Sequence, residues 1–262
     1  MLTYIFLAFS ALGSILFTFG TSIHWLWLLP IFVGLFAAFN ASFFLVLWFS
    51  TIFLPKKDPI EKTLNVYGLI WFVCDWITTL LRIKIDFRGM EQFPNEPFVL
   101  VSNHISNFDP VVVLAKVKGR KIAFVSKPSN FKIPAVGPYI HEAGFLASDR
   151  QNAMRAMRTI KRAAELVVSE QMIMGIYPEG TRSKSGELLE FKEGAFLLAK
   201  RAQAPVVVIT TKGTNQIAKN KILKSSKVEL DVIEVIDKET VQNMKLNELS
   251  AHVRESIANA LQ

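Results

Sequence analysis

The sequence predicts an α/β fold, with a mostly parallel or mixed sheet covered by helices on both faces and preceded by an N-terminal membrane helical hairpin. Two observations lead to this prediction. From residue 83 onward, short apolar runs alternate with segments of helical periodicity. All 30 Lys and Arg and all 22 Asp and Glu residues fall between Lys56 and Gln262, so the preceding part carries no charged side chain. A charge-free segment joined to a charged remainder is typical of a membrane-attached domain.

The charge-free segment contains two long apolar runs, Leu2 to about Gly20 and Trp25 to about Leu54, separated by the polar residues 21–24. Each run is long enough to cross hydrocarbon, which takes about 20 residues. A signal peptide fits the first run poorly, because no basic region precedes it and a second apolar run follows at once. We therefore predict a membrane-embedded helical hairpin over residues 1–55, with a shallow re-entrant pair as the alternative.

The residues after the hairpin predict its orientation and its connection to the rest of the chain. Lys56 and Lys57 follow the second run directly, so the positive-inside rule predicts a domain on the cytoplasmic side of the membrane. Within a connecting segment of residues 56–82, the apolar stretch from Leu64 predicts an amphipathic interfacial helix, with a buried core helix as the alternative. Residues 83–262 are predicted to form the α/β domain.

The formal net charge of +8 belongs wholly to the polar part of the chain. A basic domain is compatible with nucleic acid, an anionic lipid surface or a phosphorylated substrate. Nucleic acid is the poorest match, because the chain is predicted to be membrane-attached and carries no motif of that class. Cys74 is the only cysteine, so an intrachain disulfide is excluded.

The elements of the α/β domain follow from periodicity and turn residues. Strands are predicted at residues 83–87, 98–101, 121–126, 144–148, 172–176, 206–210 and 227–236, the last as a peripheral strand. Helices are predicted at residues 111–118, 153–168, 193–203 and 245–261. Residues 131–138, rich in Pro and Gly, are predicted to form a loop. Strands that alternate with helices favour a sheet with both faces covered.

A first group of reactive side chains lies where the second predicted strand ends. His104 and Asp109 are five residues apart, which on a regular helix places two side chains about 140° from each other. They therefore meet only if the chain between them turns, and Asp109-Pro110 indicates that a helix starts there. A histidine can accept a hydroxyl proton while a carboxylate fixes its tautomer. The alternative is an ordinary helix cap beside a hydrogen-bonded loop histidine.

A second group follows the predicted strand at 172–176, in Glu179-Gly180-Thr181-Arg182. Gly180 lets the backbone approach a ligand closely, and Arg182 offers a planar fork for phosphate oxygens. Glu179 is predicted either to hold a substrate hydroxyl or to brace Arg182. Lys127, at the end of another strand, is a candidate second cation. The alternative is a solvated turn with a local ion pair and an ordinary surface lysine.

Other kinds of chemistry have no matching pattern. The four histidines are scattered, and no Cys/His cluster has metal-ligand spacing, so we predict no metal site. The chain has no Gly-Lys-Ser/Thr phosphate loop, no Gly-x-Gly-x-x-Gly and no Gly-x-Ser-x-Gly elbow. Direct transfer is therefore favoured over a covalent intermediate.

Together, Asn103-His104-x4-Asp109 and, roughly seventy residues later, Pro178-Glu179-Gly180-Thr181-Arg182 resemble the motifs of the glycerolipid acyltransferase family. The branch that looks most similar is the 1-acyl-glycerol-3-phosphate (lysophosphatidate) acyltransferases, and the resemblance covers about residues 83–210. It implies acyl transfer from a thioester, acyl-CoA or acyl carrier protein, to the sn-2 hydroxyl of lysophosphatidate. It implies no bound cofactor, and membrane lipids as the surroundings of the reaction.

The resemblance also implies a role for each residue of the two motifs. His104 would be the general base, and Asp109 would orient and stabilise it. Asn103, with backbone N–H groups near His104, would serve the oxyanion or support the site.

The remaining implied roles concern the acceptor. Arg182, with Lys127, would hold the acceptor phosphate, and Glu179, Gly180 and Thr181 would shape the acceptor site.

Three departures from the family pattern leave the identity of the acceptor open. Ala204-Pro205-Val206-Val207-Val208 has one proline where two are common, Pro128-Ser129-Asn130 lacks an acidic residue, and Ser148 stands where an apolar residue is usual. An acyltransferase of the same fold acting on glycerol 3-phosphate or on another lysophospholipid is the first alternative. A non-catalytic membrane protein that binds anionic lipid is the second. A transporter is disfavoured, because the two apolar runs have no charged midpoint.

Overall fold

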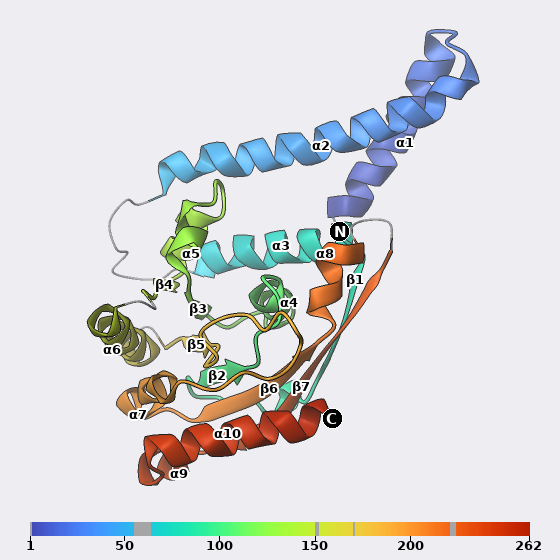
Figure 1. Cartoon of the computed structure of the whole chain (residues 1–262). Helices are drawn as coiled ribbons and strands as arrows, with labels where there is room; N and C mark the ends of the chain where they lie inside the picture. Colours follow the sequence, from blue (N-terminus) through green and yellow to red (C-terminus); the bar gives the residue numbers. More distant parts are fainter. Residues whose placement is uncertain (1, 55–63, 150–151, 170, 221–223) are drawn as a thin grey trace.

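The computed structural model describes residues 2–54, 64–149, 152–169, 171–220 and 224–262 (Figure 1). Lys56 and Lys57, on which the predicted orientation depends, lie outside the described residues. Within them, the chain forms a mostly parallel mixed sheet with helices on both faces, preceded by a hairpin of two long apolar helices. The predicted fold class is confirmed.

The sheet has the strand order β1-β7-β6-β2-β5-β3-β4, and the β6–β7 pair is antiparallel while the other pairs are parallel. Its strands are β1 (Ile83–Arg88), β2 (Val99–Ser102), β3 (Ile122–Ser126), β4 (Leu146–Ala147), β5 (Ile173–Ile176), β6 (Val206–Lys212) and β7 (Ser226–Ile236). The prediction of a peripheral strand at 227–236 was wrong, because β7 lies between β1 and β6. Its alternation of apolar and charged residues reflects one buried and one partly open face, not an edge position.

The helices lie on both sides of the sheet. In Figure 1, α3 and α4 lie above it, and α7 and α10 lie below it. The helices of the domain are α4 (Asp109–Lys116), α5 (Gly137–Glu142), α6 (Ala153–Ser169), α7 (Leu197–Ala202), α8 (Ile217–Asn220), α9 (Lys238–Asn243) and α10 (Leu246–Leu261). Short 3-10 turns are η3 (Met90–Gln92), η4 (Pro128–Lys132), η5 (Glu193–Ala195) and η6 (Thr214–Gln216). The helix predicted at 193–203 is thus η5 followed by α7, and α5 lies within the predicted loop.

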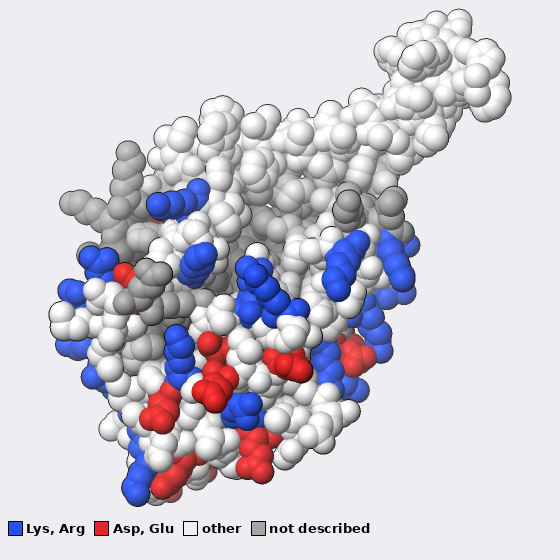
Figure 2. Space-filling model, in the orientation of Figure 1, with Lys and Arg blue, Asp and Glu red and all other residues white. Residues whose placement is uncertain are grey.

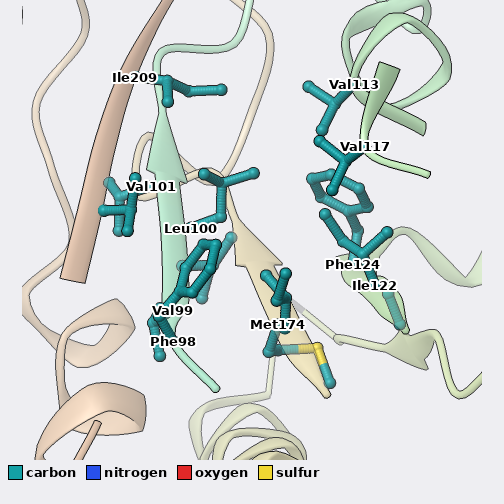
Figure 3. Close-up of a cluster of buried hydrophobic side chains, with 14 of the residues drawn as sticks. Phe98, Val99, Leu100, Val101, Val113, Val117, Ile122, Phe124, Met174 and Ile209 are labelled. Carbon is teal, nitrogen blue, oxygen red and sulfur yellow. The ribbon is translucent and has the colours of Figure 1, made fainter. Parts of the chain in front are cut away.

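The core lies around the central strands (Figure 3). The four residues from Phe98 to Val101 are each at most 2% exposed, so β2 is buried on both of its faces. Val113 of α4 and Phe124 of β3 contribute to the same cluster. Strands buried on both faces are typical of parallel sheets, and they give the residues that follow β2 and β5 a rigid base.

The hairpin consists of α1 (Leu2–Gly20), η1 (Trp25–Trp27), α2 (Leu28–Ser50) and η2 (Thr51–Phe53). Leu2–Gly20 and Trp25–Phe53 are long and apolar enough to cross a membrane, and only 22% and 6% of their most apolar windows are buried in the protein. Such exposure is unlike the core helix of a soluble protein. Figure 2 shows this part of the surface without charged side chains. These two helices indicate association with a membrane.

Helix α3 (Leu64–Leu80) joins the hairpin to the domain. On one side it packs against α4, and on the other Trp76 meets Phe43 of α2 edge to face, with ring centroids 4.8 Å apart. The indole N–H of Trp76 also donates a hydrogen bond to Oδ1 of Asn40, at 3.2 Å. At the end of α2, a 2.5 Å hydrogen bond joins the hydroxyls of Ser50 and Tyr139 of α5. The hairpin is therefore held to the domain at two places.

Candidate active site

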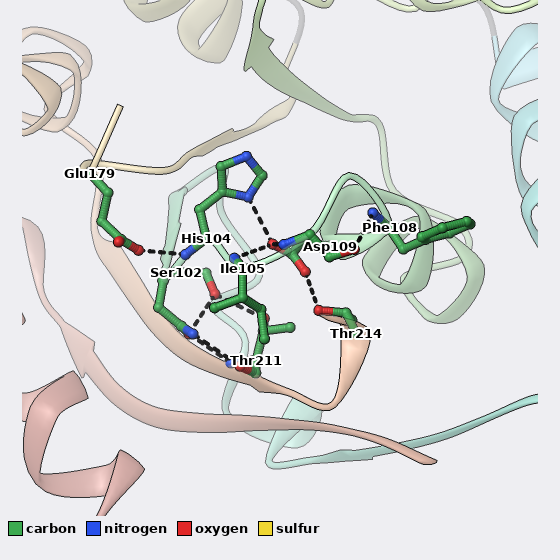
Figure 4. Close-up of polar contacts among 10 residues, drawn as sticks. Ser102, His104, Ile105, Phe108, Asp109, Glu179, Thr211 and Thr214 are labelled. Carbon is green, nitrogen blue, oxygen red and sulfur yellow. Dashed lines mark hydrogen bonds and ion pairs between the residues drawn. The ribbon is translucent and has the colours of Figure 1, made fainter. Parts of the chain in front are cut away.

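His104 and Asp109 form a hydrogen-bonded pair at the carboxyl end of β2 (Figure 4). Nδ1 of His104 lies 2.7 Å from Oδ2 of Asp109, and the backbone N–H groups of Ile105 and Ser106 donate to the same oxygen at 2.9 Å. The predicted turn therefore exists, and α4 begins at Asp109. The N-cap is Phe108, so the carboxylate of Asp109 satisfies the turn before the helix and does not cap the helix itself.

The carboxylate of Asp109 is completely buried and has partners on both oxygens. Its Oδ1 accepts a hydrogen bond from the hydroxyl of Thr214, in η6. A carboxylate at Nδ1 assigns the ring proton to that nitrogen, so the lone pair of His104 is on Nε2. The side chain of His104 is 12% exposed and borders a cavity. This arrangement suits proton abstraction by Nε2.

Glu179 lies behind His104 and is 4% exposed. One of its carboxylate oxygens accepts a hydrogen bond from the backbone N–H of His104, and the other accepts one from Leu189 at 3.1 Å. Burial raises the pKa of the Glu179 carboxyl above its ordinary value, and the two N–H donors oppose this shift. Glu179 therefore braces the backbone of the two loops, and both oxygens of its carboxylate are used for this purpose.

Asn103 is also buried and contacts the backbone of the neighbouring strand. Its Nδ2 donates to the carbonyl oxygen of Thr211 at 2.9 Å, and its Oδ1 accepts from the N–H of Thr211 at 2.8 Å. The amide thus continues the ladder between β2 and β6. Of the two predicted roles, this geometry fits support of the site, because both ends of the amide are engaged.

A cavity of about 420 Å³ opens in front of His104. Of the predicted site residues, it brings together His104, Lys127, Thr181 and Arg182, whereas Asn103, Asp109, Glu179 and Gly180 do not line it. Its other lining residues are Asn107, Pro110, Phe124, Val125, Ser126, Pro128, Ser129, Asn130, Phe145, Ser148, Asp149 and Tyr177. Lys127 and Arg182 form no ion pair within the described ranges, so both charges are available to an anion. Those ranges contain no group of three or more His, Cys, Asp or Glu side chains that could hold a metal ion.

The turn that carries Thr181 and Arg182 to the cavity depends on Gly180. Its φ is +67°, and a Cβ there would lie 3.0 Å from the side chain of Lys192. The end of the Lys192 side chain is flexible, so the backbone conformation is the main obstacle to a side chain at this position. The turn is tied to the first motif, because the N–H of Ser183 donates to the carbonyl oxygen of His104 at 2.8 Å.

Sequence reasoning missed two residues that contact the pair. Thr214 bonds Asp109, and Tyr177 stacks on the ring of His104. For Thr214 the available signal was its place in a Gly-Thr turn after a buried strand. For Tyr177 the available signal was an aromatic residue directly before the second motif.

The family model described as Acyltransferase matches residues 84–212, a span that includes both motifs. The chain is 38% identical to the chloroplastic 1-acyl-sn-glycerol-3-phosphate acyltransferase of Brassica napus, over 51% of this chain and 39% of that protein. It is 34% identical to the human 1-acyl-sn-glycerol-3-phosphate acyltransferase beta, over 60% of this chain and 56% of that one. It is 28% identical to the bovine 1-acyl-sn-glycerol-3-phosphate acyltransferase alpha, over 81% of this chain and 75% of that protein. The matches thus span less than two thirds of the Brassica and human relatives.

A solved structure shows the same architecture. The crystal structure of the 1-acyl-sn-glycerophosphate (LPA) acyltransferase of Thermotoga maritima superposes with a TM-score of 0.64 at 25% identity. The match covers 85% of this chain and 87% of that one, so it extends beyond the residues of the family model.

Proposed function

The chain belongs to the acyltransferase family, and from this premise we propose that it transfers a fatty acyl group from an acyl thioester to the sn-2 hydroxyl of lysophosphatidate, giving phosphatidate. One observation carries the proposal. His104, the base of the pair, borders the same cavity as Lys127 and Arg182, and these two cations have no ion pair among the described residues, so a base and two positive charges face one space. A hydroxyl acceptor that carries phosphate matches this combination.

In the proposed reaction, Nε2 of His104 accepts the proton of the acceptor hydroxyl while its oxygen attacks the thioester carbonyl. The new C–O bond forms a tetrahedral intermediate, which collapses as the C–S bond breaks. The proton passes from His104 to the departing sulfur, so the base is regenerated. Asp109 stabilises the imidazolium between the two steps.

The cations and the turn around Gly180 act on the acceptor. Arg182 can bind two phosphate oxygens through its planar fork, and Lys127, the N-cap residue of η4, adds a point charge. With the phosphate held there, the acceptor hydroxyl is presented to a base that is already oriented, which removes much of the entropic cost of the reaction. We propose no bound cofactor, and an acyl-CoA or acyl carrier protein thioester as co-substrate.

We propose that the reaction takes place at a membrane, with the α/β domain on the cytoplasmic side. The apolar hairpin supports membrane attachment. The basic residues Lys56 and Lys57 that follow it support the cytoplasmic side. Lysophosphatidate and phosphatidate are both lipids, so an enzyme anchored beside them does not need to extract either one into water.

A second acceptor class is favoured by the polar lining of the cavity. Ser129, Asn130 and Ser148 line it at the positions where the sequence departs from the family pattern. These hydroxyl and amide groups could bind a polar head group, as in another lysophospholipid, or the second hydroxyl of glycerol 3-phosphate.

The test is acyl transfer by the purified full chain in mixed micelles, with radiolabelled oleoyl-CoA as donor. Lysophosphatidate, glycerol 3-phosphate and a lysophospholipid with a head group are compared as acceptors, and acyl carrier protein thioester replaces the CoA donor in a parallel series. His104→Ala should lower kcat at least about 100-fold, the usual contribution of a general base. His252→Ala is the matched control, because this surface histidine bonds Glu234 and does not line the cavity. Transfer that survives in His104→Ala, or no transfer with any pair of substrates, would contradict the proposal.

A further inference from the structure

A column of aromatic rings runs from His104 into the core. The imidazole of His104 and the phenol ring of Tyr177 are stacked, with centroids 4.2 Å apart and planes inclined by 16°. The ring of Phe124 stacks on that of Tyr177, with centroids 5.6 Å apart and planes inclined by 9°. The ring centroids of Phe145 and Phe124 are 5.8 Å apart. One face of the imidazole is therefore covered by a ring that is itself supported from behind.

The sheet order explains why these rings meet. β2 and β5 are parallel neighbours, with Val101 opposite Ile176, so the residues that follow the two strands emerge at the same edge. Tyr177 is the first residue after β5, and His104 is the second after β2. Stacking between them follows from this adjacency in space and not from any nearness in the sequence.

Gly175, in the middle of β5, makes room for the column. It lies opposite Phe124 in the β3–β5 register, and a Cβ at this glycine would lie 2.2 Å from the ring of Phe124. Glycine weakens a strand interior and often marks a place where another group approaches closely. Here the ring of Phe124 occupies the space that a Cβ at Gly175 would take, and in this position it stacks on Tyr177.

The stack and the hydrogen bond to Asp109 leave one ring nitrogen of His104, Nε2, available for catalysis. Asp109 occupies Nδ1 and Tyr177 covers one face, so Nε2 is the ring nitrogen that can serve the cavity. An aromatic face also attracts a cation, and the imidazole becomes a cation when it accepts a proton. The ring of Tyr177 thus restricts the rotation of His104 and favours its protonated form in the transition state.

The hydroxyl of Tyr177 does not take part in the contact with His104. It is buried and has no hydrogen-bond partner among the described residues. Burial, and secondly the charge of Asp109, raises the pKa of the Tyr177 phenol well above its ordinary value. The side chain is therefore a neutral phenol at every pH at which the protein would work, and its ring face is the part that contacts His104.

We infer that Tyr177 is a positioning residue for the acyl transfer: its ring holds the imidazole of His104 with Nε2 toward the cavity and stabilises the imidazolium that forms there. This inference rests on the proposed function. It assigns to the residue directly before the second motif a role that acts through the base of the first motif.

The kinetic test replaces the ring in the full chain. Tyr177→Leu should lower kcat about tenfold, which corresponds to about 1.4 kcal/mol, with the KM for the acceptor within about twofold of wild type. Tyr177→Met, a second change without a ring but with a flexible side chain that fills space, should do the same. Tyr177→Phe keeps the ring and should keep kcat within about twofold. Phe93→Leu is the matched control, because it removes a ring pair with Phe98, at 5.0 Å, that does not touch His104.

A spectroscopic test of the same variants does not depend on turnover. The chain has four histidines, so the ring protons of His104 can be assigned in isotope-labelled protein by comparison with His104→Ala. Stacking on Tyr177 should shift these protons upfield in wild type and in Tyr177→Phe, and the shift should disappear in Tyr177→Leu and Tyr177→Met.

The outcomes separate the two claims. The positioning role would be overturned by any of three results. These are a wild-type kcat in both Tyr177→Leu and Tyr177→Met, a loss of kcat in Tyr177→Phe equal to theirs, or a change confined to KM. The absence of an upfield shift in wild type would overturn the stack itself. If the wild-type protein transfers no acyl group but shows the shift, the proposed function fails while the stacking of His104 on Tyr177 stands.

Discussion

Thr214 donates a hydrogen bond to Asp109 across a separation of 105 residues. Both residues are completely buried. Oδ2 of Asp109 is shared by the ring of His104 and two backbone N–H groups, so Thr214 is the partner of the other oxygen. With both oxygens bound, the carboxylate cannot rotate, and the ring that bonds to it is oriented as well.

Thr214→Val should therefore impair catalysis without a change in the shape of the side chain. Valine lacks the hydroxyl, so a buried carboxylate oxygen loses its donor. A hydrogen bond to a charged group contributes about 1.5–3 kcal/mol, so we expect kcat to fall about 10- to 100-fold. Thr214→Ser should restore most of the rate. Equal rates in the valine variant and wild type would show that Thr214 does not act on the pair.

Asp109→Asn tests the charge of the pair separately from its geometry. The carbonyl oxygen of asparagine can accept the same three N–H donors as Oδ2, and its amide can donate to the hydroxyl of Thr214. We expect thermal unfolding close to that of wild type but kcat lower by about 100-fold, because a neutral partner stabilises the imidazolium less. Asp109→Ala should lower both kcat and the unfolding temperature. A rate in Asp109→Asn close to wild type would contradict a role for the negative charge.

The raised pKa of the Glu179 carboxyl predicts that the stability of the protein depends on pH. Burial raises the pKa of its carboxyl from 4.5, so above that pH the folded protein retains a proton that the unfolded chain has released. The contribution of this group to stability therefore falls as the pH rises through the window between the unfolded and the folded pKa. Glu179→Gln cannot titrate, so the free energy of unfolding of wild type minus that of the variant should decrease as the pH rises from about 4.5.

Denaturant unfolding of both proteins in micelles, between about pH 4 and 8, measures this difference, and the other carboxylates cancel because they are common to both. If the free energies of unfolding of wild type and Glu179→Gln change in parallel with pH, the raised pKa of Glu179 is contradicted. Glu179→Gln should also lower kcat, because glutamine has one acceptor oxygen for the two backbone N–H groups of His104 and Leu189.

The fold and the pair were predictable because their signals are local. The apolar run at 98–101 and the Asp109-Pro110 start of a helix lie next to His104, so the turn between them could be predicted from neighbouring residues. The sequence predicts a loop over the segment of α5, because Gly137 and Pro138 are residue types typical of turns. Proline in the first turn of a helix is favourable, and α5 begins with these two residues.

The partners of the pair could not be predicted, because they depend on the order of the strands. Thr214 reaches Asp109 since β6 lies beside β2, and Tyr177 reaches His104 since β5 lies on its other side. A threonine that follows a glycine occurs in many ordinary turns, so the sequence did not mark Thr214 as a partner of Asp109. For Glu179, the pattern left two roles open, and its burial behind His104 shows a third, the bracing of backbone N–H groups.

The two cations of the cavity should affect the acceptor more than the chemistry. Arg182→Ala and Lys127→Met each remove one positive charge that has no ion pair among the described residues, so we expect the KM for lysophosphatidate to rise about 10-fold or more, with a smaller change in kcat. Arg182→Lys should recover only part of the affinity, because an ammonium cannot bind two oxygens in a plane. Lys184→Ala is the matched control, since this exposed lysine lies next to the turn but does not line the cavity. An equal effect of Lys184→Ala would point to a general surface potential.

The attachment of the hairpin is tested by the hydrogen bond between Trp76 and Asn40. The bond places a polar side chain of α2 against α3, and Nδ2 of the same Asn40 donates to the carbonyl oxygen of Phe36 within α2. Asn40→Leu leaves the indole N–H without its acceptor, and Trp76→Phe leaves Oδ1 without its donor. Each change should lower the free energy of unfolding in micelles by about 1–3 kcal/mol. In the double variant neither group is left unpaired, so its loss should be smaller than the sum of the single losses. Strictly additive losses would mean that this bond does not couple the hairpin to the domain, and that the edge-to-face contact of Phe43 with Trp76 and the hydrogen bond between Ser50 and Tyr139 hold the two together.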